Sequence, residues 1–342
     1  MNDYRKIKLN QILSDPQQSK AYFSKGNTTV IAGPGSGKTS ILTLKILKLL
    51  ENDIIEPQGI GCITYSREAA REIRDRLQLL GYKPHGNSFF GTVHSFCIAE
   101  VLVPFAKLYN YFDLPLPIKI ASNKDRNNVF RESLRELRFD TNDVNMTEMN
   151  RERKIGIIGQ SQIEIPSYDI ALQVAAKYEE ILHNKGLIDF DDIVNYSTIL
   201  IQNEEFVRKC IEAKFPWLLI DEYQDLGKPL HEIVLTLLIK TKIRIFAVGD
   251  PDQFIYGFQG AVPAYLEELS SFNNKINKIV LLQNYRSNQE IINASEIVLE
   301  QNRGYKAGTR QKERAEFKFH VCEAEMSEQF LYLTDTLIPQ FT

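Results

Sequence analysis

The feature that most constrains this chain is a glycine-rich segment, AGPGSGKT, at residues 32–39. It follows an apolar run at 28–31 and precedes an apolar-rich stretch at 40–50, which predicts a strand, a tight loop and a helix in that order. Glycines let backbone N–H groups close around a phosphate, and the positive end of the following helix points to the same place. The segment therefore predicts a phosphate-binding P-loop, with Ala32 in place of the first glycine of the usual pattern.

Within this loop we expect Lys38 to reach the β- and γ-phosphates of a nucleotide and Thr39 to ligate Mg²⁺. The other predicted ATP-binding residues of the loop are Gly33, Pro34, Gly35, Ser36 and Gly37. A glycine turn without a ligand is the alternative interpretation. The loop, the lysine and the threonine all stand at the offsets that phosphate binding requires, which argues against that alternative.

Length and composition are those of an ordinary globular protein. The chain has 342 residues, enough for two domains or one large domain with insertions, with 43% hydrophobic and 25% charged residues. No run has the length of a membrane span, Met1–Asn10 is charged rather than signal-like, and the four cysteines form no CxxC pair. We therefore expect a cytoplasmic protein without a membrane partner. The net charge of −3 neither supports nor excludes a nucleic-acid partner.

Short β-rich apolar runs recur along the chain, and most are followed by a helical pattern. This alternation predicts an α/β fold with a mostly parallel sheet flanked by helices. Polar or glycine residues follow each run, and ligands of parallel sheets bind at the carboxyl ends of strands. We therefore expect the polar clusters to meet at one edge of one sheet. The runs are 28–31, 60–64, 88–92, 217–220 and 243–248.

A helical subdomain is predicted between the third and fourth strands. Strand signals fade between about 99 and 185, where helical patterns such as 127–138 and 170–183 take over. The polar segment 138–153 is expected to be a mobile connection. Basic residues of the subdomain, which include Arg126, are candidates for phosphate contacts, but interleaved acids favour a solvated helix face.

A second motif, FPWLLIDEYQD at 215–225, has the pattern of a buried strand that ends in acids. A carboxylate at Asp221 can hold the Mg²⁺ that bridges the β- and γ-phosphates. Its neighbour Glu222 can orient and deprotonate the attacking water, which makes it the predicted catalytic base. An acidic pair after a strand is weak on its own, but together with the P-loop it completes one site.

A third motif, GDPDQFIYGFQGA at 249–261, combines an amide with aromatic rings. We expect the Gln253 amide to hydrogen-bond a γ-phosphate oxygen or the attacking water. Tyr256 and Phe258 offer stacking faces for unpaired bases, and burial of both rings in the core is the alternative.

Two further segments complete the predicted nucleotide site. Arg286, in NYRS at 284–287, can neutralise charge on a transferring phosphoryl group, and Tyr285 can stack on adenine. By itself NYRS would be a surface turn. The amide of Gln18 matches the N6 and N7 edge of adenine.

These motifs, in this order, resemble those of the UvrD/Rep/PcrA group of superfamily 1 DNA helicases. The resemblance spans nearly the whole chain and is highly specific as a set. The matching signatures are AGPGSGKT at 32–39, ITYSREAA at 63–70, GTVHSF at 91–96, DFDD at 189–192, DEYQD at 221–225, GDPDQFIYGFQGA at 249–261 and NYRS at 284–287.

The resemblance implies a RecA-like P-loop NTPase lobe formed by 1–98 and 186–278, with a helical insertion at 99–185 and the start of an incomplete second lobe at 279–342. It implies ATP hydrolysis, with Mg²⁺, coupled to stepping along single-stranded DNA.

The resemblance also assigns roles to single residues. It places the adenine contact on Gln18, the magnesium acid on Asp221, the base on Glu222, the γ-phosphate sensor on Gln253 and the motor arginine on Arg286. The DNA-facing positions that it implies are Thr64, Tyr65, Thr92, His94, Tyr256 and Phe258.

Four positions depart from the pattern of this group. Glu68 replaces a lysine, Gln259 replaces an arginine, Phe254 replaces a serine, and Ser40, which we include among the ATP-binding residues, stands where an arginine often follows the P-loop threonine.

Members of the group continue well beyond the point that corresponds to Thr342. We therefore expect the isolated chain to bind Mg-ATP but to hydrolyse ATP slowly and to unwind DNA poorly. We also expect that a C-terminal lobe or a nuclease on another chain completes the motor. The alternative function is a nucleotide-gated DNA-sensing subunit that regulates a partner such as a nuclease in DNA repair or phage defence. A metabolic kinase with the same P-loop would have no use for Gln18 or for the aromatic loop after Gln253.

Overall fold

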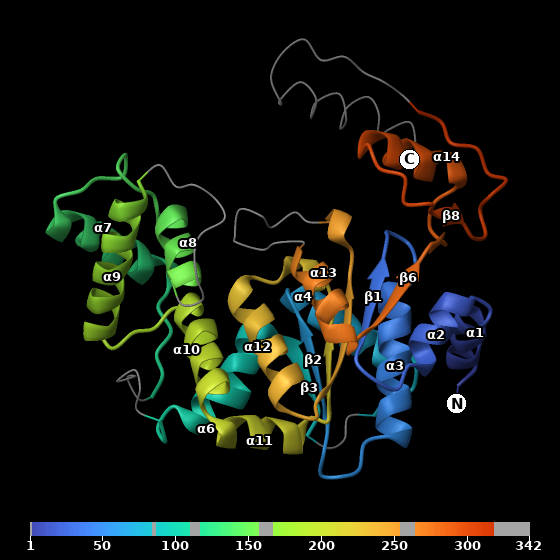
Figure 1. Cartoon of the computed structure of the whole chain (residues 1–342), viewed down its shortest axis with the longest axis horizontal. Helices are drawn as coiled ribbons and strands as arrows, with labels where there is room; N and C mark the ends of the chain where they lie inside the picture. Colours follow the sequence, from blue (N-terminus) through green and yellow to red (C-terminus); the bar gives the residue numbers. More distant parts are fainter. Residues whose placement is uncertain (1, 84–86, 110–116, 157–166, 254–263, 318–342) are drawn as a thin grey trace. The chain divides into compact units, whose positions relative to one another are not determined.

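The computed structural model of the chain describes residues 2–83, 87–109, 117–156, 167–253 and 264–317. The chain divides into two compact units, Met1–Asn284 and Tyr285–Thr342 (Figure 1). None of the helices in the described ranges has the length and apolar character needed to cross a membrane.

The first unit is built on a six-stranded sheet with the strand order β3-β2-β4-β5-β1-β6. Every neighbouring pair is parallel, so the carboxyl ends of all the strands lie at one edge. This confirms the predicted α/β fold with a parallel sheet. The strands are β1 (Thr28–Ala32), β2 (Ile60–Thr64), β3 (Phe89–Thr92), β4 (Trp217–Ile220), β5 (Arg244–Gly249) and β6 (Asn277–Leu281).

The sixth strand, β6, was expected to open a second lobe near Ile279. It instead pairs with β1, in a register that runs from Thr28 opposite Asn277 to Ala32 opposite Leu281. The side chains of Ile279 and Leu281 are buried in the same apolar cluster as Val30 of β1, which explains why this strand adds to the first sheet. The first compact unit accordingly extends to Asn284.

Helices cover both faces of the sheet because its strands are apolar on both sides. Along β4, Leu218 and Ile220 face one core, while Trp217 and Leu219 face the other. The second of these cores is closed by α1 (Asp3–Leu13), α2 (Pro16–Phe23), α3 (Lys38–Asn52) and α4 (Arg67–Leu79), and the first by α10 (Phe190–Asn203), α11 (Glu205–Lys214), α12 (Lys228–Lys240) and α13 (Ala264–Ser271).

Short elements connect these layers, and the described residues 285–317 of the second unit form one helix and one strand. In the first unit they are α5 (Val93–Phe96), the π-helix η1 (Cys97–Leu102), α6 (Val103–Phe105), the 3-10 turns η2 (Tyr223–Asp225), η3 (Pro251–Gln253) and η5 (Phe272–Asn274), and β7 (Gln283–Asn284). In the second unit they are α14 (Gln289–Val298) and β8 (Lys306–Ala307).

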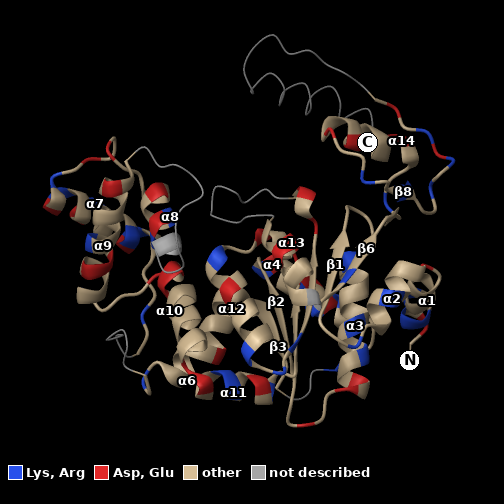
Figure 2. Cartoon of the chain, in the orientation of Figure 1, with Lys and Arg blue, Asp and Glu red and all other residues tan. Residues whose placement is uncertain are grey.

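The insertion is helical, and three of its helices form a separate group that α10 joins to the sheet layers (Figure 1). These are α7 (Asn123–Leu137), α8 (Met146–Gly156) and α9 (Tyr168–Asn184), packed around a core of their own that includes Phe130, Met149 and Tyr178. Acidic and basic residues are interleaved along all three helices (Figure 2). Arg126 of α7, expected on a solvated face, is instead mostly covered and pairs with Asp189 and Asp191.

One expectation for the insertion is wrong. The polar segment 138–153 was expected to be a mobile connection, but from Met146 onward it is helix α8. Two side chains explain the difference. Met149 is fully buried in the core of the insertion, and Arg153 is buried among acids contributed by other helices. A charged residue that finds buried partners far away in the sequence gives no local signal.

Candidate functional site

The P-loop lies between β1 and α3, so the predicted strand, loop and helix order is confirmed. Gly35 and Gly37 have φ angles of 69° and 88°, in the left-handed region where glycine is the least strained residue. The Ser36 hydroxyl donates to the carbonyl of Gly33 at 2.7 Å, which closes the loop. Helix α3 begins at Lys38, so its unpaired N–H groups open into the loop.

Gln18 lies against the P-loop. Helix α2 is capped by the Asp15 carboxylate, which accepts hydrogen bonds from the backbone N–H groups of Gln17 and Gln18. The buried amide of Gln18 donates to the carbonyl of Ser36 at 2.8 Å. A Cβ added at Gly37 would meet the same amide nitrogen at 3.0 Å. The predicted adenine-reading amide is thus held by the loop that would bind the phosphates.

Lys38 of the P-loop is the point where three sequence motifs meet. Its ammonium lies 3.7 Å from Oε2 of Glu222, 3.8 Å from Oδ2 of Asp250 and 3.4 Å from Oε1 of Gln253. The acids after β4 and the residues after β5 therefore converge on the P-loop lysine, as expected of strand ends at one edge of a parallel sheet. Asp250, which sequence reasoning did not select, is fully buried and caps η3 by accepting from the backbone N–H of Asp252.

Asp221 is buried directly after β4. Burial and the neighbouring carboxylate of Glu222 raise the pKa of Asp221 to about 7, against the lowering effect of Lys38. Its Oδ1 has no hydrogen-bond partner among the described residues, which is the state expected of a carboxylate that ligates a cation.

The oxygen atoms at this site suit a Mg²⁺ ion that is bound partly by the protein and partly by the phosphates of a nucleotide. Magnesium is usually held by one or two protein oxygens, with waters and phosphates completing the shell, and Asp221 and Thr39 are donors of that kind. The described residues contain no group of three or more His, Cys, Asp and Glu side chains arranged around a metal, so a dedicated all-protein site is absent from that part of the chain.

Glu222 adopts an unusual backbone conformation, with φ 50° and ψ 51°. This left-handed region is rarely occupied by residues with a Cβ and occurs often at functional sites. The Glu222 carboxylate accepts from the Gln224 amide at 2.8 Å, and the other end of that amide accepts from the backbone N–H of Asp250 at 2.9 Å. Gln224, also missed from the sequence, thus ties the end of β4 to the end of β5.

The turn η2 carries the acidic motif onward from Glu222. The backbone N–H of Asp225 donates to the Glu222 carbonyl at 3.0 Å. Burial and the charge of Glu222 raise the pKa of Asp225 to about 6, while Lys38 lowers it. Between these acids, the Tyr223 hydroxyl is 2.8 Å from Nδ1 of the buried His231, which anchors the turn to α12.

Several predicted residues lie outside the convergence at Lys38. Tyr285 and Arg286 belong to the second unit, where the carbonyl of Arg286 accepts from Arg310 at 2.8 Å. Tyr256 and Phe258 lie outside the described residues, so their DNA-contacting roles stay predictions.

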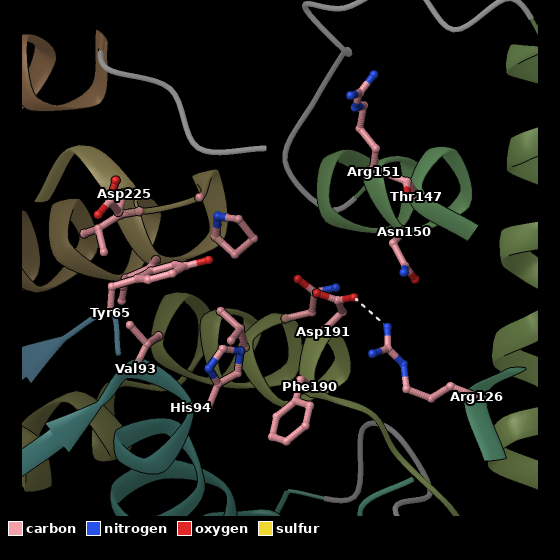
Figure 3. A pocket seen from close by; sticks show the side chains of 16 residues that line it. Tyr65, Val93, His94, Arg126, Thr147, Asn150, Arg151, Phe190, Asp191 and Asp225 are labelled. Carbon is pink, nitrogen blue, oxygen red and sulfur yellow. Dashed lines mark ion pairs between the residues drawn. The ribbon is translucent and has the colours of Figure 1, made fainter. Parts of the chain in front are cut away.

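A cavity of about 450 Å³ lies beside the ends of β2 and β3, and two predicted DNA-facing residues, Tyr65 and His94, line it (Figure 3). Its other walls come from α7, α8, α10, the turn η2 and the start of α12. They include Arg126, Thr147, Asn150, Arg151, Phe190, Asp191, Asn195, Asp225 and Leu230. Phe190 was not expected from the sequence. It stands directly after Asp189, which caps α10, and its ring packs edge-on against His94 at 5.2 Å.

Thr64 and Thr92 do not line this cavity. The Thr64 hydroxyl is buried and donates to the carbonyl of Ser66 at 2.9 Å. The Thr92 hydroxyl caps α5 by accepting from the backbone N–H of Ser95 at 3.3 Å. Both hydroxyls thus have partners within the protein, and DNA contact by either residue stays a prediction.

The DFDD segment at 189–192 forms the start of α10 and binds the helices of the insertion. Asp189 and Asp192 form a capping box at the start of the helix. The buried guanidinium of Arg153 in α8 lies 2.6 Å from Asp189, 2.5 Å from Asp192 and 2.9 Å from Glu179 of α9. Arg153 therefore joins α8, α9 and α10 through buried, hydrogen-bonded ion pairs.

The comparisons with known proteins all identify DNA helicases of one kind. The sequence profile of the UvrD/REP helicase N-terminal domain family matches residues 13–274. The chain is 31% identical over 303 residues to the ATP-dependent DNA helicase Rep of Escherichia coli (strain K12), an alignment that covers 85% of this chain and 43% of Rep. It is 28% identical over 307 residues to the ATP-dependent DNA helicase PcrA of Staphylococcus aureus (strain Mu50 / ATCC 700699), covering 86% of this chain and 41% of PcrA. The chain thus spans less than half the length of these relatives.

Proposed function

The chain belongs to the UvrD/REP helicase N-terminal domain family, and on this premise we propose that it is the ATP-hydrolysing part of a motor that moves along single-stranded DNA. The observation that carries the proposal is the convergence on Lys38. One ammonium lies within 3.8 Å of side chains from Glu222, Asp250 and Gln253. A phosphate-binding lysine, an acidic pair and a sensing amide are the parts that phosphoryl transfer to water requires.

The nucleotide-binding role follows from the loop. Its N–H groups and the positive end of α3 favour a phosphate chain at Gly33–Thr39, and Lys38 adds a full positive charge. Lys38 is held near two carboxylates, so an arriving phosphate competes with them for the ammonium. Gln18, already bonded to the loop carbonyl of Ser36, is positioned to contact the base of the same nucleotide.

The hydrolytic role rests on the acids after β4. Thr39 and Asp221 would hold Mg²⁺, which when bound neutralises charge on the phosphates. Glu222, with its carboxylate oriented by the Gln224 amide, accepts a proton from the attacking water. Gln253 donates from its amide to the γ-phosphate or that water, and Lys38 stabilises the charge on the transferred group.

The DNA-binding role is supported by the cavity at the ends of β2 and β3. Tyr65, His94 and Phe190 bring three rings to one lining, and such rings stack on unpaired bases. Because the cavity and the P-loop both open at the carboxyl edge of one sheet, nucleotide and strand would occupy neighbouring positions on the same scaffold. We also propose a cytoplasmic location, a helical insertion at 99–185 within a first lobe that extends to Asn284, and roles for Tyr285 and Arg286 in a second lobe.

The test is ATP turnover by the purified chain, measured with and without single-stranded DNA. We expect slow turnover that single-stranded DNA stimulates, with strand displacement weak or absent in the isolated chain. Nucleotide-dependent DNA affinity without any turnover would instead favour the sensing subunit that regulates a nuclease or another partner. If the chain binds neither Mg-ATP nor single-stranded DNA, both proposed functions are refuted.

A further inference from the structure

A buried histidine of α12 joins the turn η2 to helix α13. His231 is 1% exposed, and its Nδ1 lies 2.8 Å from the Tyr223 hydroxyl of η2. Its Nε2 lies 3.3 Å from Oε2 of Glu268 in α13. Its ring stacks on that of Tyr265 in the same helix, with centroids 4.6 Å apart and planes inclined by 15°. One imidazole therefore contacts the acidic turn on one side and α13 on the other.

These contacts fix where the imidazole carries its proton. Burial raises the pKa of Tyr223 well above its ordinary value, so its hydroxyl stays neutral and can donate to Nδ1. Burial also lowers the pKa of His231; Glu268 opposes that shift and Lys228 adds to it. The ring is therefore mainly neutral at physiological pH. A neutral ring that accepts at Nδ1 carries its proton on Nε2, the nitrogen nearest the Glu268 carboxylate.

The cluster does not suit nucleophilic catalysis, although a carboxylate, an imidazole and a hydroxyl in this order are the parts of a hydrolase triad. The Tyr223 side chain is fully buried and does not line the cavity beside Tyr65. Its pKa is raised, whereas a nucleophile is activated by a lowered pKa or an adjacent base in reach of substrate. The cluster therefore holds the turn in place and is not a second reaction centre.

The turn that this cluster holds begins at a strained residue. Glu222, directly before Tyr223, has φ 50° and ψ 51°, a conformation that persists only where surrounding contacts impose it. On the amino side, the backbone N–H of Asp221 donates to the carbonyl of Ile63 in β2 at 3.0 Å. On the carboxyl side, the Tyr223 hydroxyl is bonded to His231. The strained residue is thus held between β2 and α12.

We infer that His231 is a positioning residue for ATP hydrolysis. Its neutral ring accepts the Tyr223 hydroxyl and thereby keeps the Glu222 carboxylate beside Lys38, 3.7 Å from the ammonium. The inference rests on the proposed function, in which Glu222 accepts a proton from the attacking water, and adds a residue outside the sequence motifs. Because His231 acts only through the position of the base, its loss should slow hydrolysis without weakening the binding of Mg-ATP.

The test is steady-state ATP turnover by the whole chain with single-stranded DNA present, with kcat and KM determined separately. Tyr223→Phe removes the hydroxyl and His231→Leu removes its acceptor, so thermal unfolding of each variant is measured first. We expect each substitution to lower kcat about tenfold, the effect of one lost hydrogen bond. The affinity for a fluorescent ATP analogue should stay within about twofold of wild type.

Two further variants separate positioning from stability. His231→Asn keeps an acceptor near the place of Nδ1 and should recover most of the rate that His231→Leu loses. The double variant Tyr223→Phe/His231→Leu should be no slower than either single variant, because both substitutions break the same hydrogen bond. Tyr265→Phe is the matched control. It keeps the ring that stacks on His231 while removing a tyrosine hydroxyl, and it should leave kcat unchanged.

Nuclear magnetic resonance of the chain labelled with ¹⁵N-histidine gives a readout that does not depend on turnover. The chain has five histidines, so the signals of His231 are assigned by their loss in His231→Asn. We expect the proton on Nε2 and a pKa below the ordinary value of 6.5. Tyr223→Phe should shift the Nδ1 signal, because that nitrogen loses its donor.

An unchanged kcat in both His231→Leu and Tyr223→Phe overturns the inference while leaving the proposed ATPase intact. A proton on Nδ1 of His231, or rate losses that multiply in the double variant, overturn it as well. If the wild-type chain does not hydrolyse ATP at all, the proposed function fails and the positioning role fails with it.

Discussion

Arg153 Nη1 lies 2.6 Å from Asp189 Oδ2, and neither side chain is exposed to solvent. The pair joins the last turn of α8 to the residue that caps α10, and Asp192 and Glu179 extend it. Buried charges are costly to remove from water and are retained when each is paired and hydrogen-bonded. Arg153 is therefore the more buried of two arginines that, with Tyr178, attach the insertion to the start of α10, the other being Arg126.

Replacing this arginine should destabilise the chain strongly. Arg153→Met removes the nearest counter-charge of two buried carboxylates, Asp189 and Asp192, and we expect the free energy of unfolding to fall by about 3–5 kcal/mol. Urea unfolding followed by circular dichroism measures it. The exposed Arg131 of α7 is the control, where Arg131→Met should change stability by less than about 0.5 kcal/mol. Equal effects at the two sites would contradict the role given to Arg153.

The same cluster predicts a dependence on acid. Burial alone would raise the pKa of Asp189, but the charge and hydrogen bonds of Arg153 hold it at about 2, below its ordinary value of 3.8. A lowered carboxyl pKa stabilises the fold above the unfolded value, and that stabilisation is lost as pH falls from about 4 to about 2. We expect this group to contribute about 2 kcal/mol to the loss. Urea midpoints at pH 5, 4, 3 and 2.5 for the wild type and Asp189→Asn measure it, and parallel curves would refute the assignment.

Lys45 predicts that the free energy of unfolding rises with pH in alkaline solution. It is buried in α3, where its ammonium donates to the carbonyl of Tyr22 at 3.1 Å and lies 5.3 Å from the ring of Trp217. Burial lowers its pKa from 10.5 to about 8. Between these values the unfolded chain binds more protons, so stability should rise as pH increases from about 8 to 10.5, by about 3 kcal/mol from this group.

Lys45→Met should remove that rise. Stability curves from pH 7 to 10.5 would then differ between variant and wild type mainly below pH 8, where the methionine is not penalised for a buried charge. A wild-type curve that runs parallel to that of the variant would show that Lys45 does not titrate in this window.

Glu222→Gln separates binding from hydrolysis. The variant keeps the size of the side chain but cannot accept a proton, so we expect Mg-ATP affinity within about threefold of wild type and turnover reduced about 10²–10⁴-fold. Binding is measured with a fluorescent ATP analogue and turnover by phosphate release. Glu267→Gln, an exposed glutamate of α13, is the matched control. Normal turnover in Glu222→Gln would show that another group is the base.

Lys38→Met should abolish binding of the triphosphate. The lysine supplies the only full charge that we assign to the loop, and three side chains after β4 and β5 converge on it. Isothermal titration with Mg-ATP should give no measurable affinity at concentrations that saturate the wild type. The midpoint of thermal unfolding without nucleotide should be unchanged or lowered, because the substitution removes a positive charge that lies 3.7 Å and 3.8 Å from the carboxylates of Glu222 and Asp250. Retained affinity would remove Lys38 from the phosphate site.

The strand ends were the most predictable part of this molecule. Lys38, Asp221 and Gln253 follow apolar runs, and a parallel sheet brings such positions to one edge whatever the loops between them do. The cavity lining was not predictable in the same way. Asn150, Phe190 and Asn195 line one cavity with Tyr65 only because two helices, α8 and α10, pack beside the sheet, and helix packing of this kind leaves no periodic signal in the sequence. Arg153 was missed for the same reason, since its acids lie far away in the chain.

The short turn η2 has a mechanical consequence. Glu222 at its start faces the P-loop lysine, while Asp225 at its end lines the cavity, and a backbone hydrogen bond of 3.0 Å joins the two. Along the backbone, only Tyr223 and Gln224 therefore separate the residue beside the proposed phosphate site from the residue in the cavity. A displacement of Glu222 in the proposed ATPase cycle would have only this short segment to cross before it reached Asp225.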